Sequence, residues 1–192
     1  MRVLIACEYS GTVRDAFLKK GHDAMSCDLL PTESPGSHYQ GDVFDIIEDG
    51  WDLMIAHPPC TDIAVSGAAW FKEKIADGRQ QKALDFVQRL MDADIPKICI
   101  ENPISVISSK IRKPDQIVQP WMFGHETTKS TCLWLKDLSL LLPTNIVDKG
   151  VRKTYASGKS SPMWHANSGG GCGKARSVTY QGIADAMAEQ WG

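Results

Sequence analysis

The sequence predicts a single α/β domain built on an open, mostly parallel sheet with a late antiparallel strand pair. The chain has 192 residues, which is the size of one domain. Short β-branched runs alternate with segments whose apolar residues recur at helical spacing, as crossover connections between parallel strands require. Apolar residues make up 43% of the chain and charged residues 23%, which excludes disordered, collagen-like and coiled-coil proteins.

The first third of the chain predicts a strand, a helix and a second strand. Arg2 to Cys7 is a short β-branched run, and Thr12 to Lys20 follows with apolar residues at helical spacing. Gly21 ends this helix. Asp23 to Leu30 is typical of a second strand, and Pro31 to Gln40 is expected to be a loop because it is rich in Pro, Ser and Gly.

The same alternation continues in the middle of the chain. Asp52 to Ala56 predicts a strand that ends at a His-Pro-Pro-Cys sequence, and Gln80 to Met91 carries one apolar stripe of a helix. Lys97 to Ile100 predicts the next strand, which ends at a Glu-Asn-Pro sequence. These strands and the crossover helix favour parallel pairing.

The pattern changes after Pro120. Thr131 to Leu135 and Leu138 to Leu142 are apolar runs a few residues apart, which predicts the antiparallel strand pair. Gly150 to Lys174 is rich in Gly, Ser and Lys, and we expect a long mobile loop there. Apolar residues from Tyr180 to Trp191 recur at helical spacing, so an amphipathic helix should close the fold.

The cysteines predict free thiols rather than disulfides or a zinc centre. No two of the six are closer than 20 residues, and no Cys-x-x-Cys pair is present. His165 and Cys172 alone supply too few ligands for zinc, so no metal is expected. Four cysteines lie in apolar runs and are expected to act as small core residues: Cys7, Cys27, Cys99 and Cys132. Cys60 lies outside such a run.

Charge is unevenly distributed along the chain. The formal net charge is −2, yet residues 149–176 contain six basic groups and no acidic one: Lys149, Arg152, Lys153, Lys159, Lys174 and Arg176. Such a segment could contact phosphates, although a solvated loop accounts for the same run. No run reaches the length of a membrane-spanning helix, and the N-terminal apolar run meets Glu8 almost at once, so we expect a cytoplasmic protein.

The ends of the predicted strands are where ligands are expected, because open parallel sheets bind ligands outside their carboxyl ends. Asp28 follows the second strand's apolar part. A carboxylate there can accept hydrogen bonds from both hydroxyls of a ribose, and a turn-forming aspartate is the alternative interpretation.

Two further strand ends bring a thiol and a carboxyl group together. Two prolines restrict the backbone before Cys60, and Glu101 ends the next predicted strand. A thiol beside a carboxylic acid can act as a nucleophile with a proton donor, whereas the alternative is a surface turn with an incidental cysteine. His57 lies beside this thiol and could tune its pKa or contact the acceptor.

The order of Pro58-Pro59-Cys60 and Glu101-Asn102 resembles the Pro-Cys and Glu-Asn-Val motifs of the cytosine-C5 DNA methyltransferase family. The segments WMFGHETTKSTCLWLKDL and RSVTYQGIADAMAEQW are similar to small phage and prophage members, so the resemblance covers most of the chain. It implies a Rossmann-like fold of the class I methyltransferase type, S-adenosylmethionine as the cofactor and cytosine in DNA as the substrate.

The resemblance also implies roles for individual residues. The implied cofactor-binding residues are Glu8, Tyr9, Ser10 and Gly11 near the methionine end, Asp28 at the ribose, Asp42 near the adenine, and Pro58. Cys60 would add to C6 of the cytosine, Glu101 would protonate or hydrogen-bond N3, and Asn102 would orient the Glu101 loop. Implied substrate-binding residues are His57, Pro59, Lys129, Lys174 and Arg176, with Lys129 in the approximate place of the family's Gln-x-Arg-x-Arg motif.

This chain lacks the full target-recognition domain that sequence-specific members of the family carry. Only the basic loop 149–176 stands there, so we expect contacts to few bases around a flipped cytosine, a protein partner for recognition, or a smaller substrate. Three alternatives stay open: methyl transfer to a free pyrimidine nucleotide, methyl transfer to an exocyclic amine, and a catalytically silent nucleic-acid-binding protein. The resemblance implies that the protein acts in the cytoplasm of a bacterial or phage-infected host cell.

Overall fold

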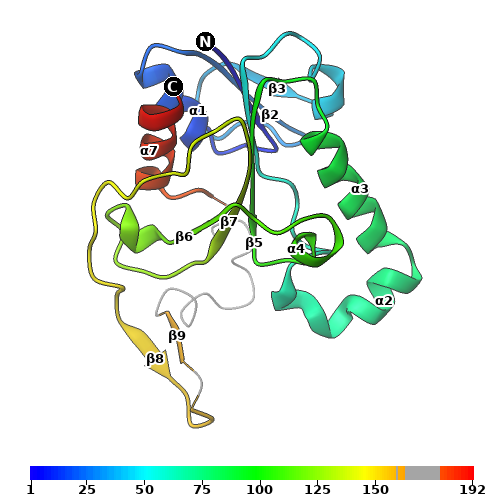
Figure 1. Cartoon of the computed structure of the whole chain (residues 1–192), viewed down its shortest axis with the longest axis vertical. Coiled ribbons are helices and arrows are strands. Elements are labelled where there is room, and N and C mark those ends of the chain that lie inside the picture. The colour runs from blue at the N-terminus through cyan, green and yellow to red at the C-terminus, as the bar shows by residue number, and fades with distance from the viewer. Residues whose placement is uncertain (159, 163–177) are drawn as a thin grey trace.

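The computed structural model describes residues 1–158, 160–162 and 178–192 of the chain (Figure 1). Its strands are β1 (Arg2–Ala6), β2 (Asp23–Asp28), β3 (His38–Gln40), β4 (Leu53–Ala56), β5 (Lys97–Pro103), β6 (Gln116–Val118), β7 (Thr131–Lys136), β8 (Arg152–Thr154) and β9 (Ser160–Pro162). Its α-helices are α1 (Thr12–Lys19), α2 (Phe71–Ala76), α3 (Arg79–Met91), α4 (Ile107–Lys110) and α7 (Gln181–Trp191). Short 3-10 helices are η1 (Val43–Asp45), η2 (Val65–Trp70) and η3 (Pro120–Met122).

The predicted sheet is confirmed. Seven strands lie in the order β3-β2-β1-β4-β5-β7-β6, and the first five run parallel to one another. β7 runs antiparallel to both of its neighbours, β5 and β6. This arrangement is the mostly parallel sheet with a late antiparallel pair that the sequence predicts.

The predicted partner of β7 is wrong. Leu138 to Leu142 does not form a strand, and β6, which precedes β7 in the chain, takes its place at the sheet edge. The side-chain amide of Gln116 in β6 binds both the backbone N–H and the carbonyl of Leu141, each at 2.8 Å. A side chain therefore holds this extended segment where backbone pairing was expected.

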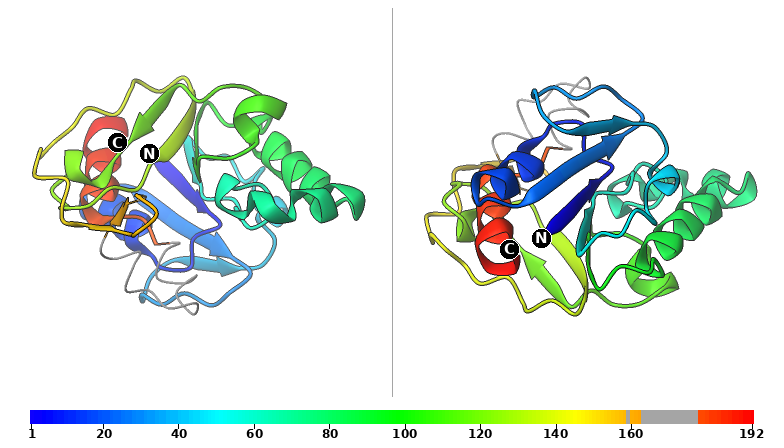
Figure 2. Two further views of the ribbon diagram at one scale, coloured as in Figure 1. Left: turned by 90° about the horizontal axis from the view of Figure 1, so that it is seen from below. Right: turned by 90° about the horizontal axis from the view of Figure 1, so that it is seen from above.

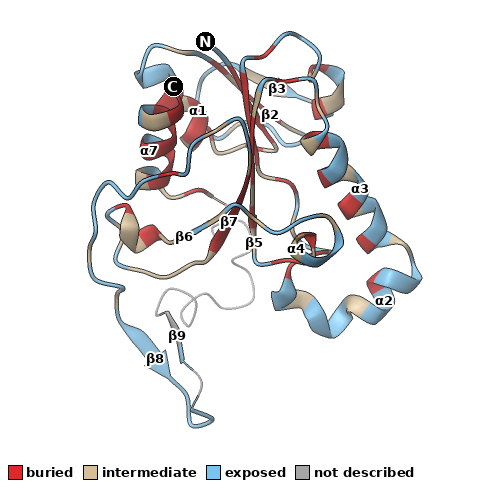
Figure 3. Cartoon of the chain, in the orientation of Figure 1, coloured by how far each residue is buried: buried red, intermediate tan, exposed pale blue. Residues whose placement is uncertain are grey.

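Helices cover the two faces of the sheet (Figure 2). α1 and α7 pack on one face over a core that includes Ile5, Ile55 and Trp191. α3 packs on the other face, over alternate residues of the same strands. Figure 3 shows that buried residues concentrate on the sheet and on the inward sides of these helices, whereas α2 and β8 are largely exposed. Successive side chains of the buried strands therefore point alternately into the two cores.

Three expected boundaries need correction. β3 lies inside the expected loop Pro31 to Gln40, and β8 and β9 form a hairpin inside the expected loop Gly150 to Lys174. β5 continues through residues 101–103 because these residues pair with β7. Glu101 and Asn102 therefore lie within a strand and not in the loop after it. The terminal helix is confirmed as α7, one residue shorter than expected.

Candidate active site

The carboxyl edge of the sheet brings several of the predicted residues together. Ala6 of β1 pairs with Ala56 of β4, and Ala56 pairs with Ile100 of β5. The residues that follow these three positions are therefore neighbours at this edge, which places His57 beside Glu101. The hairpin β8–β9 and helix α2 lie on opposite sides of the molecule (Figures 1 and 2).

The Pro58-Pro59-Cys60 turn is held to the neighbouring strand by a side chain. The Nδ2 group of Asn102, whose side chain is almost fully buried, donates a 2.8 Å hydrogen bond to the carbonyl oxygen of Pro58. The carbonyl oxygen of Cys60 accepts hydrogen bonds from the N–H groups of Ile63 and Ala64, which closes a tight turn. Asn102 thus fixes the Cys60 turn to β5, whereas the sequence analysis assigns it the role of orienting Glu101.

His57 and Glu101 form a buried pair. Nδ1 of His57 lies 3.2 Å from Oε2 of Glu101, and the side chains are 9% and 14% exposed. Burial alone would lower the pKa of His57, but the hydrogen bond and charge of Glu101, with a contribution from Glu8, raise it. Burial would raise the pKa of Glu101, but the same hydrogen bond and charge lower it. Both groups are therefore stabilised in their ionised forms.

Lys129, two residues before β7, and Thr131, the first residue of β7, also act on Glu101. The positive charge of Lys129 and a hydrogen bond from Thr131 both lower the pKa of the Glu101 carboxyl, after the larger effects of burial and of His57. Nζ of Lys129 lies 5.6 Å from the ring centre of Tyr180. The structure therefore places Lys129 near the predicted catalytic pair. Thr131 was not predicted, because only the antiparallel pairing of β5 with β7 brings it to this edge.

A separate cavity of about 230 Å³ lies at the carboxyl ends of β1 and β2. It brings together Asp28, Asp42 and Pro59, which the sequence predicts to bind cofactor or substrate. Oδ1 of Asp28 accepts from the Leu30 N–H at 2.9 Å, and Oδ1 of Asp42 accepts from the Phe44 N–H at 3.0 Å. Apolar side chains complete the lining: Leu29, Val43, Ala83 and Phe86.

The loop between β1 and α1 has a structural task. The Glu8 carboxylate accepts hydrogen bonds from the backbone N–H groups of Val13 at 2.7 Å and Arg14 at 3.2 Å, and from the Ser10 hydroxyl at 3.2 Å. It therefore caps the start of α1. Gly11 has a φ of +76°, and a Cβ atom there would lie 2.5 Å from the Arg14 guanidinium. The carbonyl oxygen of Tyr9 accepts from the N–H of Glu33.

The cysteines differ in their environments. Cys27, Cys99 and Cys132 are buried as predicted, but Cys7 is only partly buried, has a φ of +59° and lines the 230 Å³ cavity. Burial raises the pKa of all four thiols, to about 12 for Cys27, with nearby carboxylates adding to the effect. They remain protonated at neutral pH and are poor nucleophiles.

Part of the basic segment lies outside the described residues, including Lys159, Lys174, Arg176, His165 and Cys172. Of the described members, Lys149 and Lys153 lie over the rings of Trp121 and Tyr155. Arg152 binds the hydroxyl of Thr128 at 2.8 Å and Ser160 across the hairpin. All three side chains are exposed. Arg152 therefore ties the β8–β9 hairpin to the segment that carries Lys129.

Among the residues that the structure describes, no three His, Cys, Asp or Glu side chains gather as ligands of a metal ion would. No helix in this part of the chain combines the length and apolar character needed to cross a membrane.

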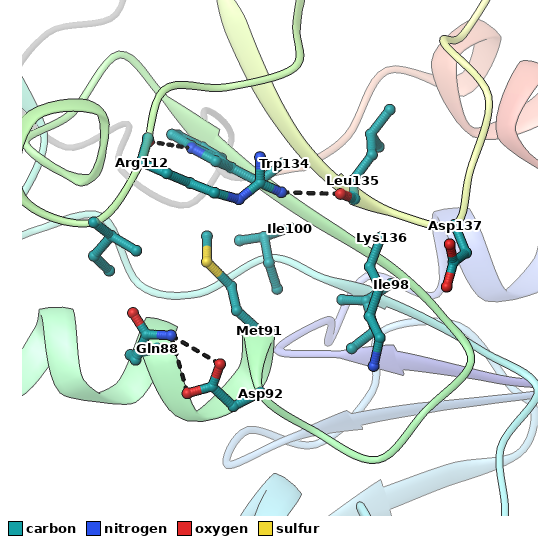
Figure 4. A pocket seen from close by; sticks show the side chains of 11 residues that line it. Gln88, Met91, Asp92, Ile98, Ile100, Arg112, Trp134, Leu135, Lys136 and Asp137 are labelled. Carbon is teal, nitrogen blue, oxygen red and sulfur yellow. Dashed lines mark hydrogen bonds between the residues drawn. The ribbon is translucent and has the colours of Figure 1, made fainter.

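A second, larger cavity, of about 630 Å³, lies away from these residues (Figure 4). Figure 4 shows it between the end of α3, with Gln88, Met91 and Asp92, and the side chains of Arg112 and Trp134. Its lining includes Ile111 and Arg112, which directly follow the one-turn helix α4. The Arg112 guanidinium is engaged internally, by Asp115 and by the carbonyl oxygens of Lys113 and Leu135. No chemistry-bearing group predicted from the sequence lies there.

No protein-family model and no curated protein matches this chain. Among the solved structures that match is a proposed DNA modification methyltransferase encoded within a prophage, from E. coli. The two share 17% identity with a TM-score of 0.53, over 77% of this chain and 52% of that one. This chain therefore has a methyltransferase-like fold and spans about half the length of that protein.

Proposed function

We propose that this protein transfers a methyl group from S-adenosylmethionine to C5 of cytosine in DNA, through a covalent adduct on Cys60. The observation that carries the proposal is the hydrogen bond from Asn102 to the Pro58 carbonyl, which holds the Cys60 turn against the strand that bears Glu101. A nucleophile and a proton donor are thereby supported by one rigid sheet edge.

The residues around the 230 Å³ cavity fit the proposed cofactor. Asp28 and Asp42 present carboxylates from the ends of adjacent parallel strands, as a ribose and an exocyclic amine require, and apolar side chains provide surfaces for a purine. Glu8 supports this site indirectly by fixing the start of α1. When bound, S-adenosylmethionine supplies the methyl group as an electrophile.

The acceptor needs activation by the protein, because C5 of cytosine is a weak nucleophile. A thiolate on Cys60 adds to C6, and a proton or hydrogen bond from Glu101 at N3 stabilises the electron-rich form. Lys129 lies close enough to Glu101 to lower its pKa, which supports a contact from Lys129 to the same base. After methyl transfer, loss of the C5 proton and elimination of Cys60 complete the reaction.

Duplex DNA is the acceptor that the exposed cations favour. Lys149, Arg152 and Lys153 project from the hairpin segment, and Lys174 and Arg176 belong to the same basic run. The prophage protein with this fold is described as modifying DNA, which supports the same substrate class. Because residues 149–176 replace a full target-recognition domain, we propose readout of few bases, or help from a protein partner, in the cytoplasm of a bacterial or phage-infected cell.

The alternatives make different demands on Cys60. Enzymes that methylate exocyclic amines usually carry an aromatic side chain after the two prolines, which stacks on the base, whereas this chain has Cys60 there. A catalytically silent binding protein would not require the Cys60 turn and Glu101 to be held together by one strand. A free pyrimidine nucleotide remains the second candidate, because the basic segment could bind a single phosphate.

The proposed reaction can be tested directly. DNA is incubated with the protein and deuterium-labelled S-adenosylmethionine, and its nucleosides are analysed by mass spectrometry. Labelled 5-methylcytosine is the expected product. Its absence from duplex and single-stranded DNA, with label found instead in free nucleotides or in an amino-methylated base, would move the protein to an alternative. Cys60→Ser should give no labelled product, and Cys99→Ser, at a buried position within β5, serves as the matched control.

A further inference from the structure

The buried pair of His57 and Glu101 contains a feature that the proposed reaction does not yet use. Nδ1 of His57 is engaged by Glu101, while its Nε2 is buried and has no hydrogen-bond partner among the described residues. Leaving a buried imidazole nitrogen unpaired costs about 1–3 kcal/mol. Such a cost points to a task other than packing for this ring.

The charges around His57 come from three elements packed against it. Glu8 at the end of β1 and Glu101 in β5 favour the protonated imidazole, and Lys129 before β7 opposes it. Glu8 is held in place by the start of α1, so its position cannot adjust to the charge of the ring. Two carboxylates and one ammonium group act on His57, and the excess of negative charge favours a proton held between His57 and Glu101.

A carboxylate at this position needs such a proton. An isolated Glu101, ionised at neutral pH, can accept a hydrogen bond but has none to donate to N3 of a cytosine. A protonated imidazole 3.2 Å away changes this, because the proton can move along the existing hydrogen bond to the carboxyl group.

We propose that His57 is the proton reservoir of Glu101: it supplies the proton that Glu101 passes to N3 of the cytosine and takes it back after methyl transfer. This inference rests on the proposed function and names the group that makes Glu101 an acid. His57 is a positioning and proton-supplying residue that acts through Glu101.

The proton and electrons balance in each step. As the Cys60 thiolate bonds to C6, the C5–C6 π electrons form a C4–C5 double bond and the C4–N3 π pair moves to N3. N3 takes a proton from Glu101, Glu101 takes the Nδ1 proton of His57, and the ring becomes neutral. In methyl transfer the C4–C5 π pair bonds to the methyl carbon, the N3 lone pair re-forms the C4–N3 double bond, and the pair of the broken sulfur–methyl bond stays on the donor sulfur. The C5 proton then leaves to solvent, its electron pair restores the C5–C6 double bond, and the C6–S pair returns to Cys60. N3 then returns its proton to His57 through Glu101.

The same geometry argues against His57 as the base that deprotonates Cys60. Its Nδ1 lies against Glu101, and the ring is charged when the pair holds its proton, so it has no free lone pair for a thiol. Of the ways in which His57 could affect the thiol, this leaves the positive charge of the ring, which favours a thiolate nearby.

The first test follows the imidazole in the cofactor-free protein. Nitrogen-15 NMR of labelled histidine should give a His57 pKa above the ordinary value in the wild type, and Glu101→Gln should lower it by at least one unit. Glu101→Asp, which keeps the charge, should retain part of the increase. If the pKa of His57 is the same in Glu101→Gln as in the wild type, His57 is not the proton reservoir of Glu101, whichever reaction the protein catalyses.

The second test uses the pH dependence of methyl transfer. His57→Gln and His57→Asn can hydrogen-bond to Glu101 but carry no exchangeable acidic proton. In both we expect the maximal rate at neutral pH to fall about 10²-fold or more, with partial recovery at acidic pH where Glu101 protonates itself, and an unchanged affinity for cofactor. His22→Gln, at the far end of the sheet, is the matched control.

The outcomes separate the two proposals. A wild-type protein that makes no 5-methylcytosine, with an intact NMR coupling of His57 to Glu101, would contradict the proposed function alone. Wild-type methylation with the same pH profile in His57→Gln would contradict the reservoir alone. If one His57 variant fails to fold, as judged by its melting curve, the other carries the test, and the Glu101→Gln titration stands independently of both.

Discussion

The side-chain amide of Asn102 donates a 2.8 Å hydrogen bond to the carbonyl oxygen of Pro58, across the pairing of β5 with the strand that precedes the Pro-Pro-Cys turn. Asn102 is 1% exposed, so this bond forms in a site closed to water. One buried amide therefore couples the segment that carries Cys60 to the strand that carries Glu101.

Removing that amide should damage stability and activity together. Asn102→Ala leaves the Pro58 carbonyl without its donor, and we expect the free energy of unfolding to fall by about 1–3 kcal/mol. Methyl transfer should fall further than the folded fraction does, because the Cys60 turn loses its attachment. Urea denaturation and single-turnover rates measure the two effects. Gln81→Ala, which removes an exposed helix hydrogen bond to Asp85, should cost less than about 0.5 kcal/mol. Equal behaviour of the two variants would contradict this role of Asn102.

Cofactor binding should depend on the carboxylates of the smaller cavity. S-adenosylmethionine should raise the melting temperature of the protein, since any ligand selective for the folded state does so. Asp28→Ala should reduce this shift because the ribose hydroxyls lose a charged acceptor. Calorimetry gives the change in affinity, and Asp85→Ala on the exposed side of α3 is the control. No shift at millimolar cofactor would count against the proposed cofactor.

The basic segment should make DNA binding sensitive to salt. If the six cations of residues 149–176 contact phosphates, the logarithm of affinity should fall steeply with the logarithm of salt concentration. Each contact removed, as in Lys149→Gln or Lys153→Gln, should reduce the slope by about 0.9. Lys82→Gln on α3 should leave the slope unchanged. Identical slopes in all variants would favour the nucleotide as substrate.

The His57–Glu101 pair should give stability a characteristic pH dependence. The folded-state pKa of His57 lies above its ordinary 6.5, so its contribution is complete below about pH 6.5 and is lost as pH rises through the raised pKa. The folded-state pKa of Glu101 lies below its ordinary 4.5, so its contribution is complete above about pH 4.5 and is lost as pH falls through the lowered value.

The free energy of unfolding of the wild type should therefore exceed that of His57→Gln most strongly between about pH 4.5 and pH 6.5, and the difference should shrink toward about pH 9. Denaturation curves at several pH values measure it. His22 supplies a control of opposite sign, because burial lowers its pKa and its protonation opposes folding. A flat difference curve for His57→Gln would show that the pair is not charged in the folded protein.

Much of the sheet could be predicted because its central strands are buried on both faces and form continuous apolar runs between Gly and Pro signals. β6 could not, since Gln116–Val118 is too short to show a period. Leu138 to Leu142 was wrongly predicted to be a strand because its apolar pattern matches one. In the structure the Gln116 side chain, and not a neighbouring strand, forms hydrogen bonds with the backbone of Leu141.

The candidate site, too, could be predicted only in part from the sequence. Strand ends placed the Cys60 turn, which includes His57, near Glu101, because parallel neighbours end at one edge. Only the family resemblance predicted that Asp42 lies near Asp28. Which side chain bonds to which depends on register and on rotamers that the sequence does not reveal. The sequence therefore assigned Asn102 to the Glu101 loop, where the structure has it bound to Pro58.

The most direct test of the proposed reaction is covalent trapping on a DNA duplex that contains 5-fluorocytosine. Fluorine at C5 cannot leave as a proton, so addition of Cys60 to C6 followed by methyl transfer should leave protein and DNA joined, only when S-adenosylmethionine is present. Peptide mass spectrometry should find the adduct on Cys60; Cys60→Ser should form none, and Cys99→Ser should form it normally. Methyl transfer at the wild-type rate by Cys60→Ser, without any adduct, would contradict the covalent mechanism.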